Sequence, residues 1–246
     1  MATQLTLVNN IMERLREDTV SSVNDNSYSK LIGRFVNDSI ADLEDINYEW
    51  SVYVTEVDIT ILADSSTTTY TATGTNERSW LMRDYNDDRI PAAYDITANE
   101  VAQLVDAPYK DIKREQAIGS NNASQTTTYP RCFALKSNAT GTGFELEIPY
   151  PVDSSDSART WRTYWYVPQS ELALDGTDDA TSILLPSRPI EMRAIFYALN
   201  ERGEEMGEPG GVAESRANAA LAAALENDMQ VQKKSEEIDI KRNESL

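Results

Sequence analysis

The stretch Ile183–Met206, ILLPSRPIEMRAIFYALNERGEEM, decides the predicted fold because it passes from a strand-like segment into a helix. Ser187 is placed to cap this helix, and Pro189 falls in its first turn, where a missing N–H costs nothing. An apolar stripe predicts a buried face made of Met192, Ile195, Phe196 and Leu199. The other face is polar, with Glu191, Arg193, Asn200, Glu201 and Arg202. One amphipathic helix cannot bury its own stripe, so it needs a partner elsewhere in the chain.

Both ends of the chain supply candidate partner helices. The first is a short helix that ends near Asp18, with a stripe made of Leu5, Val8, Ile11, Met12 and Leu15. The second begins at a cap on Ser27, and its stripe consists of Tyr28, Leu31, Ile32, Phe35, Val36, Ile40, Leu43 and Ile46. The third, at 212–232, follows the turn GEPGG and is rich in alanine, with a stripe of Leu221, Ala224, Leu225 and Met229. We therefore expect residues 1–50 and 183–232 to form one helical bundle.

Between these helices the apolar residues alternate with a period of two, which predicts β-strands. Val57, Ile59 and Ile61 alternate with polar residues, and further strands are predicted at 131–136, 143–148 and 160–167. In the last of these, the alternation assigns Trp161 and Trp165 to the core, and leaves Tyr164 and Tyr166 for an interface. Thr97 and Glu100 form a capping box, which predicts a short helix at 100–105 that ends before Pro108.

The predicted fold class is therefore α+β: a bundle of N- and C-terminal helices with an antiparallel β-sandwich or barrel-like domain inserted at 51–182. The segment 233–246, KKSEEIDIKRNESL, is charged and is expected to be extended. Two interpretations of this tail stand: a frayed terminus, or an arm that becomes ordered on a partner.

The composition restricts the chemistry that we expect. The chain of 246 residues has no histidine, one cysteine (Cys132) and a formal charge of −19. It therefore lacks the commonest general base and the commonest transition-metal ligand, and no intrachain disulfide is possible. No segment has the apolar length of a membrane span or the pattern of an export signal. The charge argues against tight DNA binding; it either keeps the protein soluble or forms a wall past which nucleic acid moves.

Candidate ligand and catalytic motifs are weak. Asp84, Asn86, Asp88 and Asp95 imitate the spacing of a calcium loop, but Arg89 replaces the required glycine. Gly141 and Gly143 precede a strand, so we interpret them as a turn and not as a dinucleotide site. Glu145 and Glu147 alternate with apolar residues and are expected to be solvated. We expect no metal, no cofactor and no catalytic residue.

Several segments together resemble a known family. The segments YPRCFAL, GFELEIPYP, TYWYVPQSEL and LLPSRPIEMRAIFYAL, preceded by LVNNIMERL and LIGRFVNDSIADLEDINYEW, resemble the head-to-tail adaptor proteins of tailed bacteriophages. This family includes the tail tubular protein A, or gatekeeper, proteins. The segment 67–128 carries no matching landmark.

The resemblance implies a structural protein of the virion neck, present in the host cytoplasm during assembly. It implies a homo-oligomeric ring, commonly dodecameric, that binds the portal protein above and a tail nozzle or tail tube component below. Genomic DNA would pass through the channel without sequence-specific binding, and no membrane, cofactor or catalysis is expected. Candidate interface residues are Tyr164, Tyr166, Lys233, Lys234, Ile238, Ile240 and Leu246.

Two other functions remain open at this point. The first is a carbohydrate- or receptor-binding virion module built on the β domain, with Tyr164 and Tyr166 as stacking platforms. The second is a hydrolase that uses a pair of carboxylates, a residue type that is plentiful in this chain.

Overall fold

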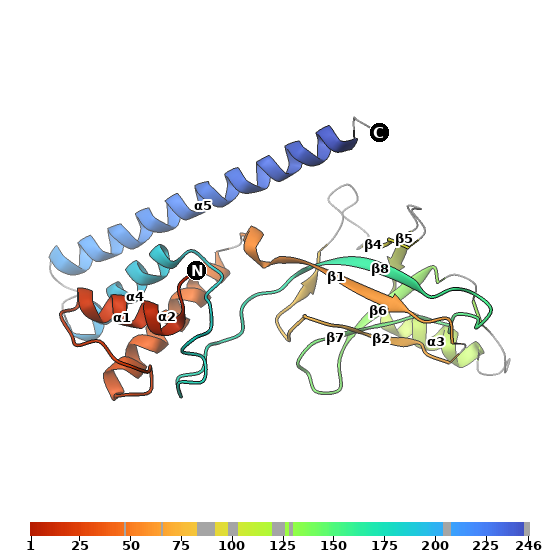
Figure 1. Ribbon diagram of the computed structural model, residues 1–246, viewed down its shortest axis with the longest axis horizontal. Helices are drawn as coiled ribbons and strands as arrows, with labels where there is room; N and C mark the ends of the chain where they lie inside the picture. Colours follow the sequence, from red (N-terminus) through yellow and green to blue (C-terminus); the bar gives the residue numbers. More distant parts are fainter. Residues whose placement is uncertain are drawn as a thin grey trace. The chain divides into compact units, whose positions relative to one another are not determined.

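The chain is a mixed α+β protein that divides into two compact units (Figure 1). The helical unit consists of Met1–Val52 and Gln169–Leu246, and the β unit consists of Tyr53–Pro168. Residues 169–182, which the sequence analysis assigns to the β domain, therefore lie in the helical unit. The computed structural model describes residues 1–46, 48–64, 66–82, 92–97, 103–119, 126–127, 130–203 and 208–243.

Four helices form the helical unit: α1 (Gln4–Arg14), α2 (Ser27–Asp45), α4 (Ser187–Glu201) and α5 (Glu208–Asn243). The side chain of Thr3 caps α1 by accepting a hydrogen bond from the Thr6 amide. Asn26 caps α2 and forms a reciprocal capping box with Ser29. The predicted cap at Ser27 was therefore wrong by one residue, because the amide oxygen of Asn26 reaches two free N–H groups of the first turn.

The predicted stripes of α1 and α2 meet in one core. Its fully buried members include Leu7, Val8, Ile11, Ile32, Val36 and Leu43. The segment 169–185 is held against these helices by hydrogen bonds that span the sequence. The Gln4 amide donates to the Thr181 carbonyl (3.1 Å), and the Val23 amide donates to the Asp179 carboxylate (3.1 Å). These bonds explain why the segment belongs to the helical unit.

The buried face of α4 differs from the predicted one. Residues Ile190, Glu191, Ala194 and Ala198 are buried, whereas Met192, Ile195, Phe196 and Leu199 are only half-buried. The reason is that α4 packs against α1, α2 and α5, and small residues such as Ala194 and Ala198 are buried where these helices approach closely, while the larger side chains lie at the margin. Ser187 does not cap α4, since the N-cap is Pro186 without a side-chain hydrogen bond. Pro189 lies in the first turn, as predicted.

Glu191 was predicted to be exposed, and it is 8% exposed. Its carboxylate accepts a hydrogen bond from the side-chain amide of Asn10 (3.0 Å) and lies 3.4 Å from the guanidinium of Arg14. A buried carboxylate is tolerated where such partners replace water. Glu191 thus joins α4 to α1.

The last helix is longer than predicted and buries a different face. It has 36 residues, or about 54 Å at 1.5 Å per residue, and it includes 208–211 of the predicted turn. Within 211–233, where burial is described, the buried positions are all alanines: Ala213, Ala217, Ala220 and Ala224. Leu221 and Leu225 are half-buried, and Met229 is exposed. The prediction of an extended tail was wrong for 233–243, which continue α5; Leu246 lies outside the described residues.

The β unit contains eight described strands. They are β1 (Val54–Ile61), β2 (Thr69–Ala72), β3 (Trp80–Leu81), β4 (Ala92–Asp95), β5 (Gln103–Asp106), β6 (Cys132–Ser137), β7 (Phe144–Glu147) and β8 (Arg159–Tyr166). The hydrogen-bonded order is β1-β8-β4-β5-β6-β7-β2, with β3 on β8, and the described strands do not close into a barrel. Gly141 has a φ of 71° in the turn between β6 and β7, which agrees with the predicted turn.

One strand pair departs from the predicted antiparallel arrangement. β5 and β6 are parallel, and α3 (Tyr109–Gly119) forms the crossover between them. The sequence analysis placed a short helix at 100–105, but 103–105 belong to β5 and the helix begins after Pro108. Residues 98–102 lie outside the described part of the chain.

The core of the β unit confirms the predicted alternation. Trp161 and Trp165 are fully buried, and Ile59 of β1 pairs with Trp161 across the sheet. Trp165 donates its indole N–H to the hydroxyl of Thr163 (2.8 Å), which in turn donates to the Val57 carbonyl (2.8 Å). These bonds satisfy polar groups that would otherwise be costly to bury.

Candidate interaction surfaces

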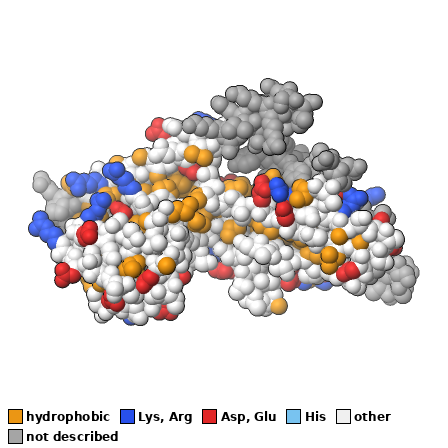
Figure 2. All heavy atoms as spheres, in the orientation of Figure 1, with side chains coloured by type: hydrophobic (Ala, Val, Ile, Leu, Met, Phe, Trp, Pro, Cys, Tyr) orange, Lys and Arg blue, Asp and Glu red, His pale blue; other side chains and the backbone are white. Residues whose placement is uncertain are grey.

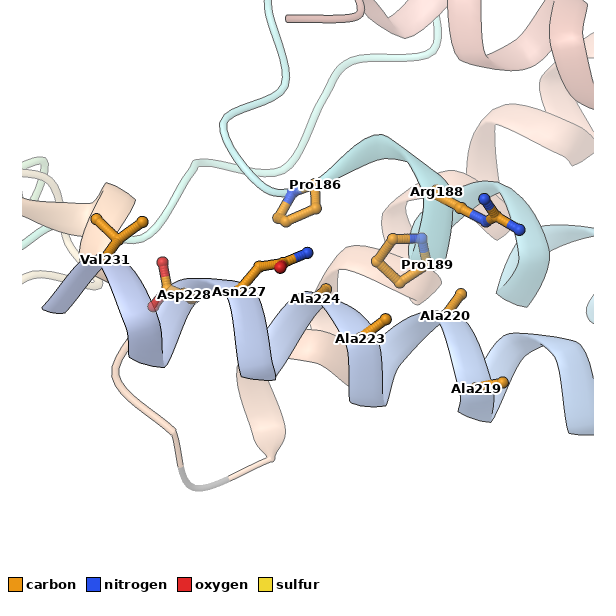
Figure 3. A pocket seen from close by; sticks show the side chains of 10 residues that line it. All are labelled: Pro186, Arg188, Pro189, Ala219, Ala220, Ala223, Ala224, Asn227, Asp228 and Val231. Atoms are coloured by element: carbon orange, nitrogen blue, oxygen red, sulfur yellow. The ribbon is translucent and has the colours of Figure 1, made fainter. Parts of the chain in front are cut away.

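A groove of about 560 Å³ lies between the first turn of α4 and the middle of α5 (Figure 3). Figure 3 shows alanine side chains of α5 that face Pro186 and Pro189 of α4 across the groove. We call this the α4–α5 groove; it is lined by Pro186, Arg188, Pro189, Ala219, Ala220, Ala223, Ala224, Asn227, Asp228 and Val231. Ala219, Ala223 and Val231 are exposed, so the groove presents apolar surface to solvent.

The two charged side chains of the groove differ in their hydrogen-bond and ion-pair partners. Arg188 is exposed and has no ion-pair or hydrogen-bond partner within the described part of the chain. Asp228 is engaged by four donor groups. The donors to Asp228 are uncharged groups, so the groove carries an unpaired positive charge at Arg188 and a hydrogen-bonded negative charge at Asp228, beside an apolar floor.

Asp228 fixes α5 to the segment 48–51. Its carboxylate accepts hydrogen bonds from the Tyr48 hydroxyl (2.8 Å), the Ser51 amide (3.0 Å), the Ser51 hydroxyl and the Gln232 side chain (3.1 Å). Gln232 also donates to the Glu49 carbonyl (2.9 Å). We call this set of contacts the Asp228 clamp. The clamp fixes the position of α5 along its own axis. The small alanine side chains on the buried face of α5 would by themselves define this position only weakly.

A second surface lies on the β unit, where aromatic rings are layered. Trp80 is 44% exposed and stacks on Tyr166, with ring centroids 4.1 Å apart and an interplanar angle of 23°. Tyr166 is 2% exposed and meets Tyr53 edge-on at 5.4 Å. Val54 faces Tyr166 from β1 and is 38% exposed, and Tyr164 is 37% exposed. We call Val54, Trp80, Tyr164 and Tyr166 the aromatic patch; Figure 2 shows apolar side chains at the surface of both units.

The layering changes the roles of the two predicted tyrosines. Tyr164 is accessible, whereas Tyr166 is covered and supports Trp80 from beneath, so Tyr166 is not itself a contact surface in this structure. The sequence analysis missed Trp80. The signal that was present is a tryptophan in a polar context, between Ser79 and Leu81, outside every predicted strand.

Charged side chains beside the aromatic patch satisfy one another. Arg162 lies 2.8 Å from Glu56 and makes two bonds with Asp58 (2.9 and 3.0 Å). The hydrogen bonds from Arg162 lower the pKa of Asp58, and Asp58 in turn raises the pKa of Arg162. The three side chains together carry one net negative charge.

The predicted tail residues lie on or beyond the end of α5. Lys233 is exposed. Lys234, Ile238 and Ile240 belong to the same continuous helix. Residues 233–243 therefore prolong α5, and Leu246 lies outside the described residues.

Glu147 was predicted to be solvated, but it is buried. It is 1% exposed, is hydrogen-bonded by Lys113 and by Gln116 (2.9 Å), and lies 3.3 Å from Lys136. Burial would raise the pKa of Glu147, but the hydrogen bonds from Lys113 and Gln116 and the charge of Lys136 outweigh it, so the pKa is lowered. A carboxylate with a lowered pKa is a poor general acid, and this one joins α3 to β6 and β7.

The calcium-like spacing does not assemble a site in the described residues. Asp95 is buried against Arg159 (2.8 Å), while Asp84, Asn86 and Asp88 lie outside the described residues. In the described ranges, no group of three or more His, Cys, Asp or Glu side chains is arranged to hold a metal ion. Likewise, none of the described helices is long and apolar enough to cross a membrane.

Comparison with known proteins adds no assignment. A search against protein-family models finds no matching model, and a search of the curated proteins finds no match to this chain.

Proposed function

We propose that this protein is a non-catalytic ring subunit of the virion neck, which joins the portal of a tailed bacteriophage to its tail and surrounds the DNA exit channel. The fold that goes with this proposal is a bundle of N- and C-terminal helices carrying an inserted β-sandwich. Helices from both chain ends packed together, and a β unit formed by the residues between them, support it.

The observation that carries the proposal is α5. Within 211–233, the part of α5 whose burial is described, the last buried position is Ala224, the Asp228 clamp follows it, and the helix itself continues to Asn243. Exposed apolar side chains, Val212, Met229 and Val231, lie along the same helix. A long helix with an uncovered surface is expected in a subunit that is completed by neighbours or by a portal.

The charge fits passage of DNA without binding. A formal charge of −19 repels the phosphate backbone, whereas DNA-binding surfaces depend on clustered Lys and Arg. In the proposed ring, the acidic surface keeps the duplex from adhering to the channel.

The direct test is a mass measurement by analytical ultracentrifugation, first of the free protein and then of the protein mixed with portal-bearing phage heads. We expect a stoichiometric ring on the heads. A second sample lacks residues 233–246, and we expect it to attach more weakly because the prolongation of α5 is missing. A full-length chain that neither oligomerises nor attaches to heads would exclude the proposed function.

A carbohydrate-binding module is the second candidate, and the exposed Trp80 is the observation that favours it. Sugar sites also need polar groups that are free to bind hydroxyls, and Glu56, Asp58 and Arg162 beside the patch already satisfy one another. A glycan array separates the two functions: binding that is lost in Trp80→Ala would support the module, and the ring subunit is expected to bind no glycan.

A further inference from the structure

We propose that the aromatic patch of one copy of this chain docks into the α4–α5 groove of the next copy, and that this contact builds the ring. The inference rests on the proposed function, which requires a homo-oligomer, and it deepens that function by naming the two surfaces. A ring with head-to-tail contacts needs two unlike surfaces on each subunit, and the patch and the groove are unlike in shape and in charge.

The patch has the properties of a binding anchor. Trp80 is held flat on Tyr166, which is itself fixed edge-on by Tyr53. An indole that is already immobilised loses little side-chain freedom when it is buried by a partner. Tryptophan and tyrosine dominate the residues that contribute most to protein interfaces. The patch is thus a rigid aromatic surface.

The groove has the properties of the receiving surface. Its floor consists of alanines, so a large ring can approach the backbone of α5, and Pro186 and Pro189 form the opposite wall (Figure 3). Its volume of about 560 Å³ is sufficient for an aromatic side chain with its neighbours. Few of its lining atoms are polar, so burying an indole there leaves few unsatisfied hydrogen-bonding groups.

The charges favour a second copy as the occupant. Arg188 at the groove is unpaired among the described residues, whereas the Glu56–Asp58–Arg162 group beside the patch carries one net negative charge. Docking the patch in the groove brings these opposite charges to the rim of the same interface. Such pairs set orientation and partner choice more than affinity.

The decisive experiment mixes two variants that are each defective in a different surface. Trp80→Ala removes the exposed indole and leaves the groove, and Ala223→Glu blocks the groove and leaves the patch. Ala223 is exposed on a helix, so we expect its variant to fold; Ala222→Glu, one residue away and outside the groove lining, is the matched control. Each defective variant is expected to weaken self-association about 30-fold or more, which corresponds to the loss of one dominant interface residue.

The mixture of the two variants is expected to form a heterodimer, because one intact patch and one intact groove remain. Ultracentrifugation of the free proteins and of the proteins on portal-bearing heads gives the masses. If each variant by itself still formed rings, the assignment of the two surfaces would be wrong, although the proposed ring would stand. A wild-type chain that forms no ring in either setting would instead refute the proposed function.

Cross-linking gives an independent result. Glu56→Cys and Arg188→Cys are combined in a Cys132→Ser background and treated with a short bismaleimide. A ladder of oligomers supports the contact between copies. Products that run only at the mass of one chain, or no product at all, would overturn it.

Discussion

Replacing Asp228 with alanine should loosen α5 from the helical unit. The carboxylate accepts four hydrogen bonds, and three of the donors are groups of Tyr48 and Ser51. The variant removes the acceptor and leaves these half-buried donors without it. Because the alanine face of α5 carries little apolar area, we expect the Asp228 clamp to supply much of the hold on this part of the helix.

The magnitude follows from the hydrogen bonds to a charged group, each worth about 1.5–3 kcal/mol when buried. The site is half-buried, so water replaces part of what is lost, and alanine raises helix propensity by a few tenths of a kcal/mol. We therefore expect Asp228→Ala to lower the free energy of unfolding by about 2 kcal/mol. Asp228→Asn, which keeps an acceptor oxygen, should lose about half as much.

Urea unfolding followed by far-ultraviolet circular dichroism measures the loss, and hydrogen exchange of the backbone amides near Asp228 locates it. Glu226→Ala is the matched control: it also removes one negative charge from α5, but Glu226 is exposed, and we expect a change within about 0.5 kcal/mol. If the two variants unfold at the same urea concentration, and exchange near residue 228 is unchanged, the clamp does not hold α5.

Three further outcomes can be measured. Glu147→Gln should lower the free energy of unfolding by about 1–3 kcal/mol at neutral pH. Because the pKa of Glu147 in the folded protein lies below 4.5, the stabilisation by its carboxylate is lost as the pH falls from 4.5 through that lower value. In urea titrations, the difference in stability between wild type and variant should therefore disappear over this pH range. Ala224→Leu should overpack the α4–α5 contact and cost about 1–3 kcal/mol, whereas exposed Ala223→Leu should change the midpoint little. Burial raises the pKa of Tyr70 to about 12, so the neutral Tyr70 side chain stabilises the fold fully below the ordinary pKa of 10.0, and this stabilisation is lost as the pH rises through about 12. The difference in tyrosinate absorbance between wild type and Tyr70→Phe should show a titration near pH 12.

Periodicity predicted the helices where large side chains mark one face. Ile32, Val36 and Leu43 of α2 are buried as expected, and so are Val8, Ile11 and Met12 of α1, whereas Leu5 is half-buried and Leu7 takes its place in the core. The method failed for α4 and α5 for a common reason. Where the two helices approach closely, alanines such as Ala194 and Ala220 hold many of the buried positions, and larger residues such as Phe196 and Met229 remain at the margin. A stripe of large apolar side chains therefore does not identify the buried face of these helices.

The β region shows which strands local sequence specifies. The burial alternates from Val57 to Ile61 in β1 and from Trp161 to Trp165 in β8, and both strands were predicted. β5 has four residues and lies beside a capping-box pattern, so its pairing with β6 is fixed by the β5-α3-β6 crossover and not by its own sequence. Tyr164 was identifiable as an exposed aromatic residue, but the roles of Trp80 and Tyr166 depend on β3 pairing with β8, which no local pattern marks.

The Asp228 clamp and the α4–α5 groove share a residue, and this connects stability to assembly. Asp228 lines the groove and also holds the segment 48–51, which leads into β1. The groove keeps its shape only while α5 keeps its position against α4, and the alanine face resists sliding poorly. Asp228→Ala should therefore weaken ring formation although every groove alanine is intact, whereas Glu226→Ala should not. If ring formation by Asp228→Ala were equal to wild type while its stability fell by about 2 kcal/mol, the groove would be defined by α4 and the alanines alone.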